Sequence, residues 1–198
     1  MVQYARPNGT SSDGNWTNTH TAIDNTNDPT GTGADGDSVI GDGTGGSEIQ
    51  VDFTLTDTVT DPSTGSGHKL YFRFKRDEQA DGEGPGGSSS DCTLTVKLME
   101  GGSTRATRVI TADTTPSVGS SFTYNSEASG ATSFNLTAGE ANSIGTYNDL
   151  FVRVLWEDSE ATDYVFVSQI VLETPDAGGG GGSSIAPIAM NHYRRLRG

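Results

Sequence analysis

Apolar and polar residues alternate along several short stretches of this chain. The clearest stretch is 48–55, where every second residue is apolar, and the stretches 68–75 and 91–100 repeat the pattern. A period of two is typical of a β-strand with one buried face. The residues expected to face a core are Ile49, Val51, Phe53, Leu55, Leu70, Phe72, Phe74, Cys92, Leu94, Val96 and Leu98.

Two later stretches, 149–156 and 164–173, are nearly continuous in apolar residues. This pattern predicts strands inside a sheet, with neighbours on both sides. Weaker strands are expected at 104–111 and 120–125, each anchored by two apolar or aromatic residues. One helical signal stands between the strands: Thr137 is followed three positions later by Glu140. This spacing is a capping box and predicts a single helical turn over one end of the fold.

The connections 24–46 and 77–90 are rich in Gly, Asp, Asn, Thr and Ser, which favour turns and solvent, so surface loops are predicted there. Short strands separated by such loops predict an all-β protein: an antiparallel jelly-roll-like β-sandwich over residues 1–176. The first loop carries enough Asp and Asn to hold a Ca²⁺ ion, but its spacing does not match the calcium-binding loop of an EF-hand. Incidental loop chemistry and a bound calcium both remain open, and no other cofactor is expected.

The chain ends in a segment of a different kind. Residues 177–184 form a Gly/Ser-rich linker with five consecutive glycines, which predicts a flexible tether. Residues 185–198 are apolar and basic, and we expect them to dock on another protein surface. The docking residues predicted in this peptide are Ile185, Pro187, Ile188, Met190, Tyr193, Arg194, Arg195, Leu196 and Arg197.

Composition narrows the function. The chain has 12 Lys and Arg against 26 Asp and Glu, a net charge of −14, which argues against nucleic acid and anionic membranes as partners. No apolar stretch approaches the length of a membrane span, and the first residues do not form a signal peptide. The single cysteine, Cys92, excludes an intrachain disulfide and is expected in the core.

The sequence carries none of the common catalytic motifs. The three histidines, His20, His68 and His192, are far apart, and no zinc, phosphate-binding or nucleophile motif is present. We therefore expect a protein that is not an enzyme and has no catalytic residues and no metal site.

Several segments resemble small β-sandwich virion proteins of tailed bacteriophages and prophages. They are Tyr-Ala-Arg-Pro-Asn-Gly-Thr at 4–10, Gly-Asn-Trp-Thr at 14–17, the stretch 60–70, the stretches 136–144 and 147–154, and the tail 185–197. The resemblance implies a structural component of the virion whose partners are other virion proteins, such as the major capsid protein or tail subunits. It also implies a homo-oligomer on the particle. The expected role is a capsid decoration or cement protein anchored through its C-terminal peptide.

The alternative function is a carbohydrate-binding module on a phage tail or fibre, because β-sandwiches with exposed aromatic residues commonly stack on sugars. The candidates are Trp16, Tyr71, Tyr147 and Trp156. Trp156 shares its strand face with apolar residues and is expected in the core, and Trp16 is expected to hold the first loop against the sandwich. Tyr71 alone is predicted to point outward, which makes it the candidate glycan contact.

Overall fold

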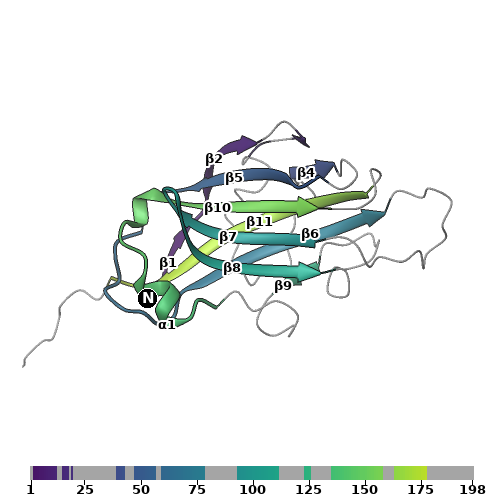
Figure 1. Ribbon diagram of the computed structural model, residues 1–198. Helices are drawn as coiled ribbons and strands as arrows, with labels where there is room; N and C mark the ends of the chain where they lie inside the picture. The colour runs from purple at the N-terminus through teal and green to yellow at the C-terminus, as the bar shows by residue number, and fades with distance from the viewer. Residues whose placement is uncertain are drawn as a thin grey trace, which may run out of the picture.

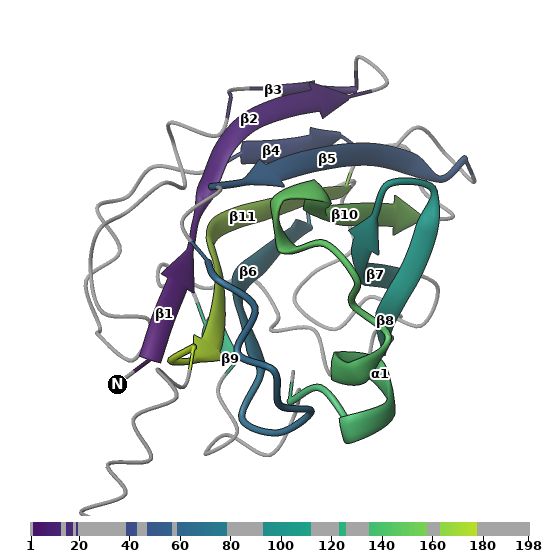
Figure 2. The same cartoon turned by 90° about the vertical axis from the view of Figure 1, so that its left-hand side faces the viewer.

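A computed structural model of the chain describes residues 2–12, 15–17, 19, 39–42, 47–56, 59–78, 93–111, 123–125, 135–157 and 163–177. Two antiparallel β-sheets pack face to face in this part of the chain, with a short helix at one end (Figures 1 and 2). The all-β antiparallel sandwich predicted from the alternating pattern is therefore confirmed.

One sheet has five strands in the order β2–β5–β10–β7–β8. Its strands are β2 (Pro7–Ser12), β5 (Ile49–Leu55), β10 (Leu150–Glu157), β7 (Thr93–Glu100) and β8 (Ser103–Thr111). In Figure 1 this sheet lies toward the viewer, and in Figure 2 it lies on the right.

The other sheet has six strands, with the main order β3–β4–β11–β6–β9 and with β1 also paired to β11. The strands are β1 (Val2–Ala5), β3 (Trp16–Thr17), β4 (Val39–Asp42), β6 (Lys69–Glu78), β9 (Thr123–Asn125) and β11 (Asp163–Pro175). Strand β4 pairs with the first half of β11 and β1 pairs with its last residues. Strands β10 and β11 are both interior strands, as their continuous apolar sequences predicted.

From β4 to β7, and again from β8 to β11, successive strands alternate between the two sheets, as in a jelly roll. The first crossing is made by Arg6, between β1 in one sheet and β2 in the other. Its carbonyl accepts a hydrogen bond from Thr56 N at 2.8 Å, and its own N–H donates to Thr56 Oγ1 at 3.1 Å. These bonds satisfy backbone groups that would lose their ladder partners where the chain leaves a sheet.

The core lies between the sheets and is filled by the apolar faces that alternation predicted. Among the described core residues, Phe53, Phe72, Phe74, Leu94, Leu98 and Trp156 have no exposed surface. The core position expected for Trp156 is thus confirmed. Trp16 is 7% exposed and its ring packs beside Gly41 in β4, so it anchors the N-terminal segment to the sandwich as expected.

The sequence predicted the N-terminal strands less well. The expected loop 24–46 contains β4, and β1 to β3 were not predicted as strands. These strands are two to six residues long and carry few apolar residues, so their pattern is too short to distinguish from a loop. Strands β1 and β4 pair with β11 and β2 pairs with β5, which are far away in the sequence, and β3 pairs with β4. This pairing gives the four segments their strand geometry.

The predicted helical turn is α1 (Ala138–Asn142), followed by the 3-10 helix η5 (Tyr147–Asp149). Thr137 is the N-cap of α1, and both hydrogen bonds of the capping box with Glu140 are present. Figure 2 shows α1 at the end of the sandwich that faces the viewer, next to β8. The predicted position over one end is confirmed.

Several predictions fall outside the described residues: the core position of Cys92, the start of the strand 120–125, most of the loops 24–46 and 77–90, the linker after Ala177 and the docking peptide 185–198. Among the described residues, no helix has the length and apolarity needed to cross a membrane.

Candidate functional site

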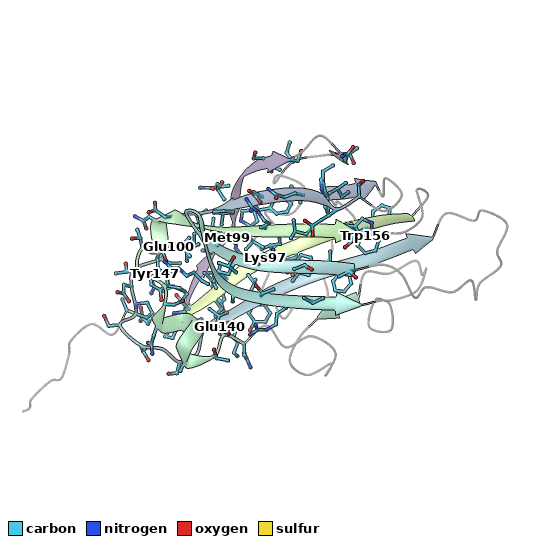
Figure 3. The ribbon with its side chains drawn as sticks, in the orientation of Figure 1. Lys97, Met99, Glu100, Glu140, Tyr147 and Trp156 are labelled. Carbon is cyan, nitrogen blue, oxygen red and sulfur yellow. The ribbon has the colours of Figure 1, made fainter. Side chains whose placement is uncertain are left out.

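The outer face of the five-stranded sheet is the surface on which β5, β10, β7 and β8 turn polar and apolar side chains away from the core. We call it the β10 face, after its central strand. Because side chains alternate along a strand, its members are the residues between the core positions. They are Gln50, Asp52, Thr54, Thr93, Thr95, Lys97, Met99, Thr107, Val109, Phe151, Arg153, Leu155 and Glu157. Figure 3 labels Lys97 and Met99 on β7, in the part of this face toward the viewer.

An arginine–carboxylate pair lies at the centre of the β10 face. Arg153 donates from Nε to Asp52 Oδ1 and from Nη2 to Asp52 Oδ2, each at 2.8 Å. The two residues are direct partners in the ladder between β10 and β5. Two parallel hydrogen bonds fix both planar groups, and the bonds to Asp52 raise the pKa of the Arg153 guanidinium. The side-chain amide of Gln50, turned so that its oxygen faces the guanidinium, accepts from Arg153 Nη2 at 3.2 Å.

Lys97 lies directly across from Arg153 on the other neighbouring strand. Two cations opposite each other on adjacent strands repel. Asp52 neutralises Arg153, but within the described residues Lys97 forms no ion pair. The β10 face therefore carries one cation that lacks a counter-charge, although the whole chain has a net charge of −14.

Phe151 gives the β10 face an aromatic ring. It is half-buried, and the Arg153 guanidinium lies 5.6 Å from its ring centroid. Its cross-strand partners are Thr54 on β5 and Met99 on β7. Met99 is only 4% exposed, so part of the apolar surface beside the ring is already covered. The result is one accessible ring next to polar groups that are held in place.

The outer face of the six-stranded sheet has a different character. Tyr71 lies on this face, as alternation predicted, but it is only 9% exposed, so the prediction that it is an accessible sugar contact is wrong. Its hydroxyl donates to Glu173 Oε2 at 3.0 Å, and Glu173 also lies 3.9 Å from Lys69 Nζ. Next to Tyr71 in the ladder is Val171, which is fully buried. Period two gives the side on which a residue lies, but long neighbours on the same side decide whether it reaches solvent.

A buried polar pair lies near the end of the sandwich that α1 covers. His68 is 1% exposed, and its Nε2 is 2.6 Å from the hydroxyl of Tyr147 in η5. Burial lowers the pKa of His68 and, with the nearby carboxylates of Asp61 and Glu100, raises the pKa of Tyr147 to about 12. Both groups are therefore neutral near pH 7 and hold the 61–68 segment against η5. Tyr147, another candidate sugar contact, is 8% exposed and has this structural role instead.

The second polar group at this end attaches α1 to the five-stranded sheet. Arg108 of β8 donates to both carboxylate oxygens of Glu140, at 2.8 and 3.1 Å, and to the Asn135 carbonyl at 2.7 Å. Glu140 also accepts from the backbone N–H of Thr137. These bonds, above all those from Arg108, lower the pKa of Glu140 to about 2. The ion pair between Arg108 and Glu140 attaches α1 to β8. Both side chains are thus already used inside the fold and are not available to a ligand.

The sequence-predicted site residues are thus not brought together. Trp16, Tyr147 and Trp156 are buried, Tyr71 is buried against Glu173, and the docking peptide lies outside the described residues. Sequence reasoning missed the β10 face. A signal was present, since Phe151 and Arg153 alternate with core residues, but the near-continuous apolar run of β10 hid the period.

Within the described part of the chain, no three His, Cys, Asp or Glu side chains form a group that could hold a metal ion. The acidic loop for which calcium was considered lies almost wholly outside that part, so the calcium alternative is untested.

Comparison with known proteins found weak structural similarities to solved structures, two of which are to carbohydrate-binding modules. No protein-family model and no curated protein matches the chain. A solved structure of the carbohydrate-binding module TmCBM61 in complex with β-1,4-galactotriose is similar with a TM-score of 0.38 and 10% identity, over 82% of this chain and 85% of that one. A family 29 carbohydrate-binding module from Piromyces equi is similar with a TM-score of 0.37 and 12% identity, over 88% and 92%. Both TM-scores are low, so neither similarity carries an argument about the function of this chain.

Proposed function

We propose that this chain is a non-catalytic binding protein and that its β10 face binds carbohydrate. The observation that supports this most is the half-buried Phe151 ring beside the Arg153–Asp52 pair, at the centre of a rigid five-stranded sheet. A sugar ring has an apolar C–H surface and a rim of hydroxyl groups. An accessible aromatic ring suits the first, and fixed polar groups suit the second.

The β10 face has the rigidity that such binding needs. Its members stand on four neighbouring antiparallel strands, with residue-by-residue pairing from β5 across β10 to β7 and β8. The two hydrogen bonds to Asp52 hold the Arg153 side chain before any ligand arrives. A surface that is ordered in advance loses less conformational entropy on binding.

The state of the acidic groups supports binding over catalysis. Asp52 and Glu140 each accept from an arginine through both carboxylate oxygens, and Glu173 accepts from Tyr71. The oxygens of these carboxylates already accept hydrogen bonds inside the fold, so they are poorly placed to act as a general acid or a nucleophile. The same arrangement serves a binding face well, because it fixes where the donors and acceptors lie.

Affinity electrophoresis in gels that contain soluble polysaccharides, followed by calorimetry with the matching oligosaccharides, tests the proposal. Phe151→Ala should weaken the binding of any retarding glycan by about tenfold, since a contact with an aromatic ring contributes up to about 1.5 kcal/mol beyond the area it buries. The matched control is Tyr4→Ala, which removes an aromatic side chain that is 37% exposed on the other sheet. This variant should bind like the wild type.

Thermal unfolding of each variant, followed by circular dichroism, is the check that both variants are folded. If no polysaccharide in a broad panel retards the wild-type chain, the proposal is wrong. It is also wrong if Phe151→Ala and Tyr4→Ala lose the same affinity, because the binding surface would then not be the β10 face.

A further inference from the structure

Lys97 on the β10 face, which forms no ion pair with any other residue that the structure describes, points to the chemical class of the ligand. This inference rests on the proposed function and makes it more specific. Lys97 is half-buried on β7, in the centre of the sheet and not at its rim. Its cross-strand neighbours are Arg153 on one side and Thr107 on the other.

The placement of Lys97 is unfavourable for the fold alone. Like charges directly across a strand pair destabilise a sheet, and a neutral side chain at position 97 would avoid the repulsion. Asp52, Arg153 and Lys97 lie side by side on β5, β10 and β7, so Asp52 is separated from Lys97 by Arg153. Both carboxylate oxygens of Asp52 accept hydrogen bonds from Arg153. A residue that breaks a local rule without compensation inside the fold is a candidate for function.

We propose that the β10 face binds an acidic glycan, with the carboxylate or sulfate of one sugar unit at Lys97 and the same or a neighbouring sugar ring against Phe151. Both residues lie one step from Arg153, Lys97 across the ladder and Phe151 two residues along β10. An anion at Lys97 would relieve its repulsion with Arg153. The hydroxyl groups of Thr95 and Thr107, on the same outer face, supply donors and acceptors for the sugar around the anion.

The surroundings favour a glycan over a nucleic acid or another uniformly charged polyanion. The net charge of −14 repels a polyanion at long range, whereas a single anionic group on a sugar meets one local cation. Within the described residues, Arg153 is already neutralised by Asp52, and the exposed Glu157 ends β10 on the same face. The centre of this face therefore offers one unpaired cation, Lys97, and not a basic stripe.

The experiment uses the full chain and matched pairs of oligosaccharides on an array, followed by calorimetry. One pair is xylotriose that carries a single glucuronic acid and plain xylotriose, and the other is 3′-sialyllactose and lactose. We expect the acidic member of at least one pair to bind about tenfold more tightly than its neutral partner. Lys97→Gln should remove this preference, Lys97→Arg should keep it, and higher salt should reduce it.

The control is Lys69→Gln, which removes a lysine from the six-stranded sheet and should leave both affinities unchanged. Lys97→Gln should also unfold at the same or a higher denaturant concentration than the wild type, because it removes the repulsion between Lys97 and Arg153. A clear loss of stability in this variant would show that Lys97 has a structural role.

Failure of this inference can be distinguished from failure of the proposed function. Equal binding of acidic and neutral partners that is lost in Phe151→Ala would overturn the acidic-glycan inference and leave carbohydrate binding intact. No glycan binding by the wild type would overturn both. The wild type could also bind single-stranded DNA or polyglutamate more tightly than any glycan. This result would assign Lys97 to a different partner and overturn the inference.

Discussion

Gly41 in β4 is a position at which the fold leaves no room for a side chain. A Cβ added there would lie 2.8 Å from Cη2 of Trp16 and 2.9 Å from Cγ1 of Val165, closer than packed carbon atoms approach each other. Both neighbours are buried and cannot move toward solvent. The absence of a side chain at position 41 is therefore what allows Trp16 to cover β4.

Gly41→Ala should lower the free energy of unfolding by about 1–3 kcal/mol, the usual cost of overpacking a core. Urea unfolding followed by tryptophan fluorescence measures this change. Gly102→Ala is the control, because no atom lies within 4 Å of a Cβ at that position. Equal stability of the two variants would show that Trp16 does not pack as described.

His68 should make stability depend on pH. Burial lowers its pKa in the folded chain, with Tyr147 as its hydrogen-bond partner and Asp61 as a weaker opposing influence. In the unfolded chain, His68 has its ordinary pKa of 6.5. As pH falls, the unfolded chain therefore takes up this proton at a higher pH than the folded chain does. The free energy of unfolding should therefore decrease below about pH 6.5, by at most ~1.4 kcal/mol per pH unit.

Comparing the wild type with His68→Gln by urea unfolding at several values from pH 5 to 8 tests this. Glutamine can still bond to Tyr147 but does not titrate, and His20 and His192 are present in both chains. The difference between the two stabilities should change as pH falls. A constant difference would mean that His68 titrates alike in the folded and unfolded chains.

Single residues also show where alternation is a reliable guide. It placed Trp156 in the core correctly, because a residue in an apolar face of an interior strand has another sheet opposite it. It placed Tyr71 on the outer face correctly but misjudged its exposure. The partner that covers its hydroxyl, Glu173, is about a hundred positions away, and no local pattern could reveal the pair.

At the scale of elements, α1 depends on contacts beyond its own five residues. A helix this short is unstable alone, and the capping box adds only two hydrogen bonds. Arg108 on β8 supplies the tertiary attachment through Glu140. The same carboxylate thus caps the helix and fixes it to the sheet.

Glu140→Gln should lower the free energy of unfolding at pH 7 by about 1–2 kcal/mol, since a charge-assisted pair becomes a neutral bond. The pKa of Glu140 is lowered from 4.5 to about 2, so its contribution is present above pH 4.5 and lost as pH falls toward 2. Unfolding measured at pH 7 and near pH 3 should show the wild-type advantage shrinking. Glu157→Gln, at an exposed position that ends β10, is the control and should change little.

The long strands and α1 were predictable because each carries its own signal: a clear period, an apolar run or a capping box. The short strands β1, β3 and β4 could not be predicted, because each has four residues or fewer. A segment this short adopts strand geometry only when it pairs with a neighbouring strand. The sequence fits a loop equally well at these positions. These segments are strands and not loops because they form ladder hydrogen bonds with β11 or with another short strand.

For the whole molecule, the described fold should not need the C-terminal segment. Strand β11 ends at Pro175 and supplies interior pairing on both sides, so every described strand lies before Ala177. The sequence predicts that the peptide from Ile185 to Arg197 docks on another protein surface, and the resemblance to virion proteins implies that the partner is another virion protein.

Truncation after Ala177 should leave a folded chain with the same denaturant midpoint as the full chain. It should also remove association with phage particles, measured by co-sedimentation, while glycan binding by the β10 face persists. A truncated chain that still sediments fully with particles would show that the anchor lies elsewhere. A large loss of stability would show that residues beyond 177 belong to the sandwich.

The sequence by itself determined the class of fold, the identity of the core faces, the interior position of β10 and β11 and the helical turn, because these follow from local periodicity and local capping. Only the tertiary structure decided which strands are neighbours, and with that which side chains meet. Asp52, Lys97 and Arg153 lie about fifty positions apart along the chain, and the registers β5–β10 and β10–β7 place them in one row. Register is set by packing of the whole sheet, so the candidate site became visible only in the folded molecule.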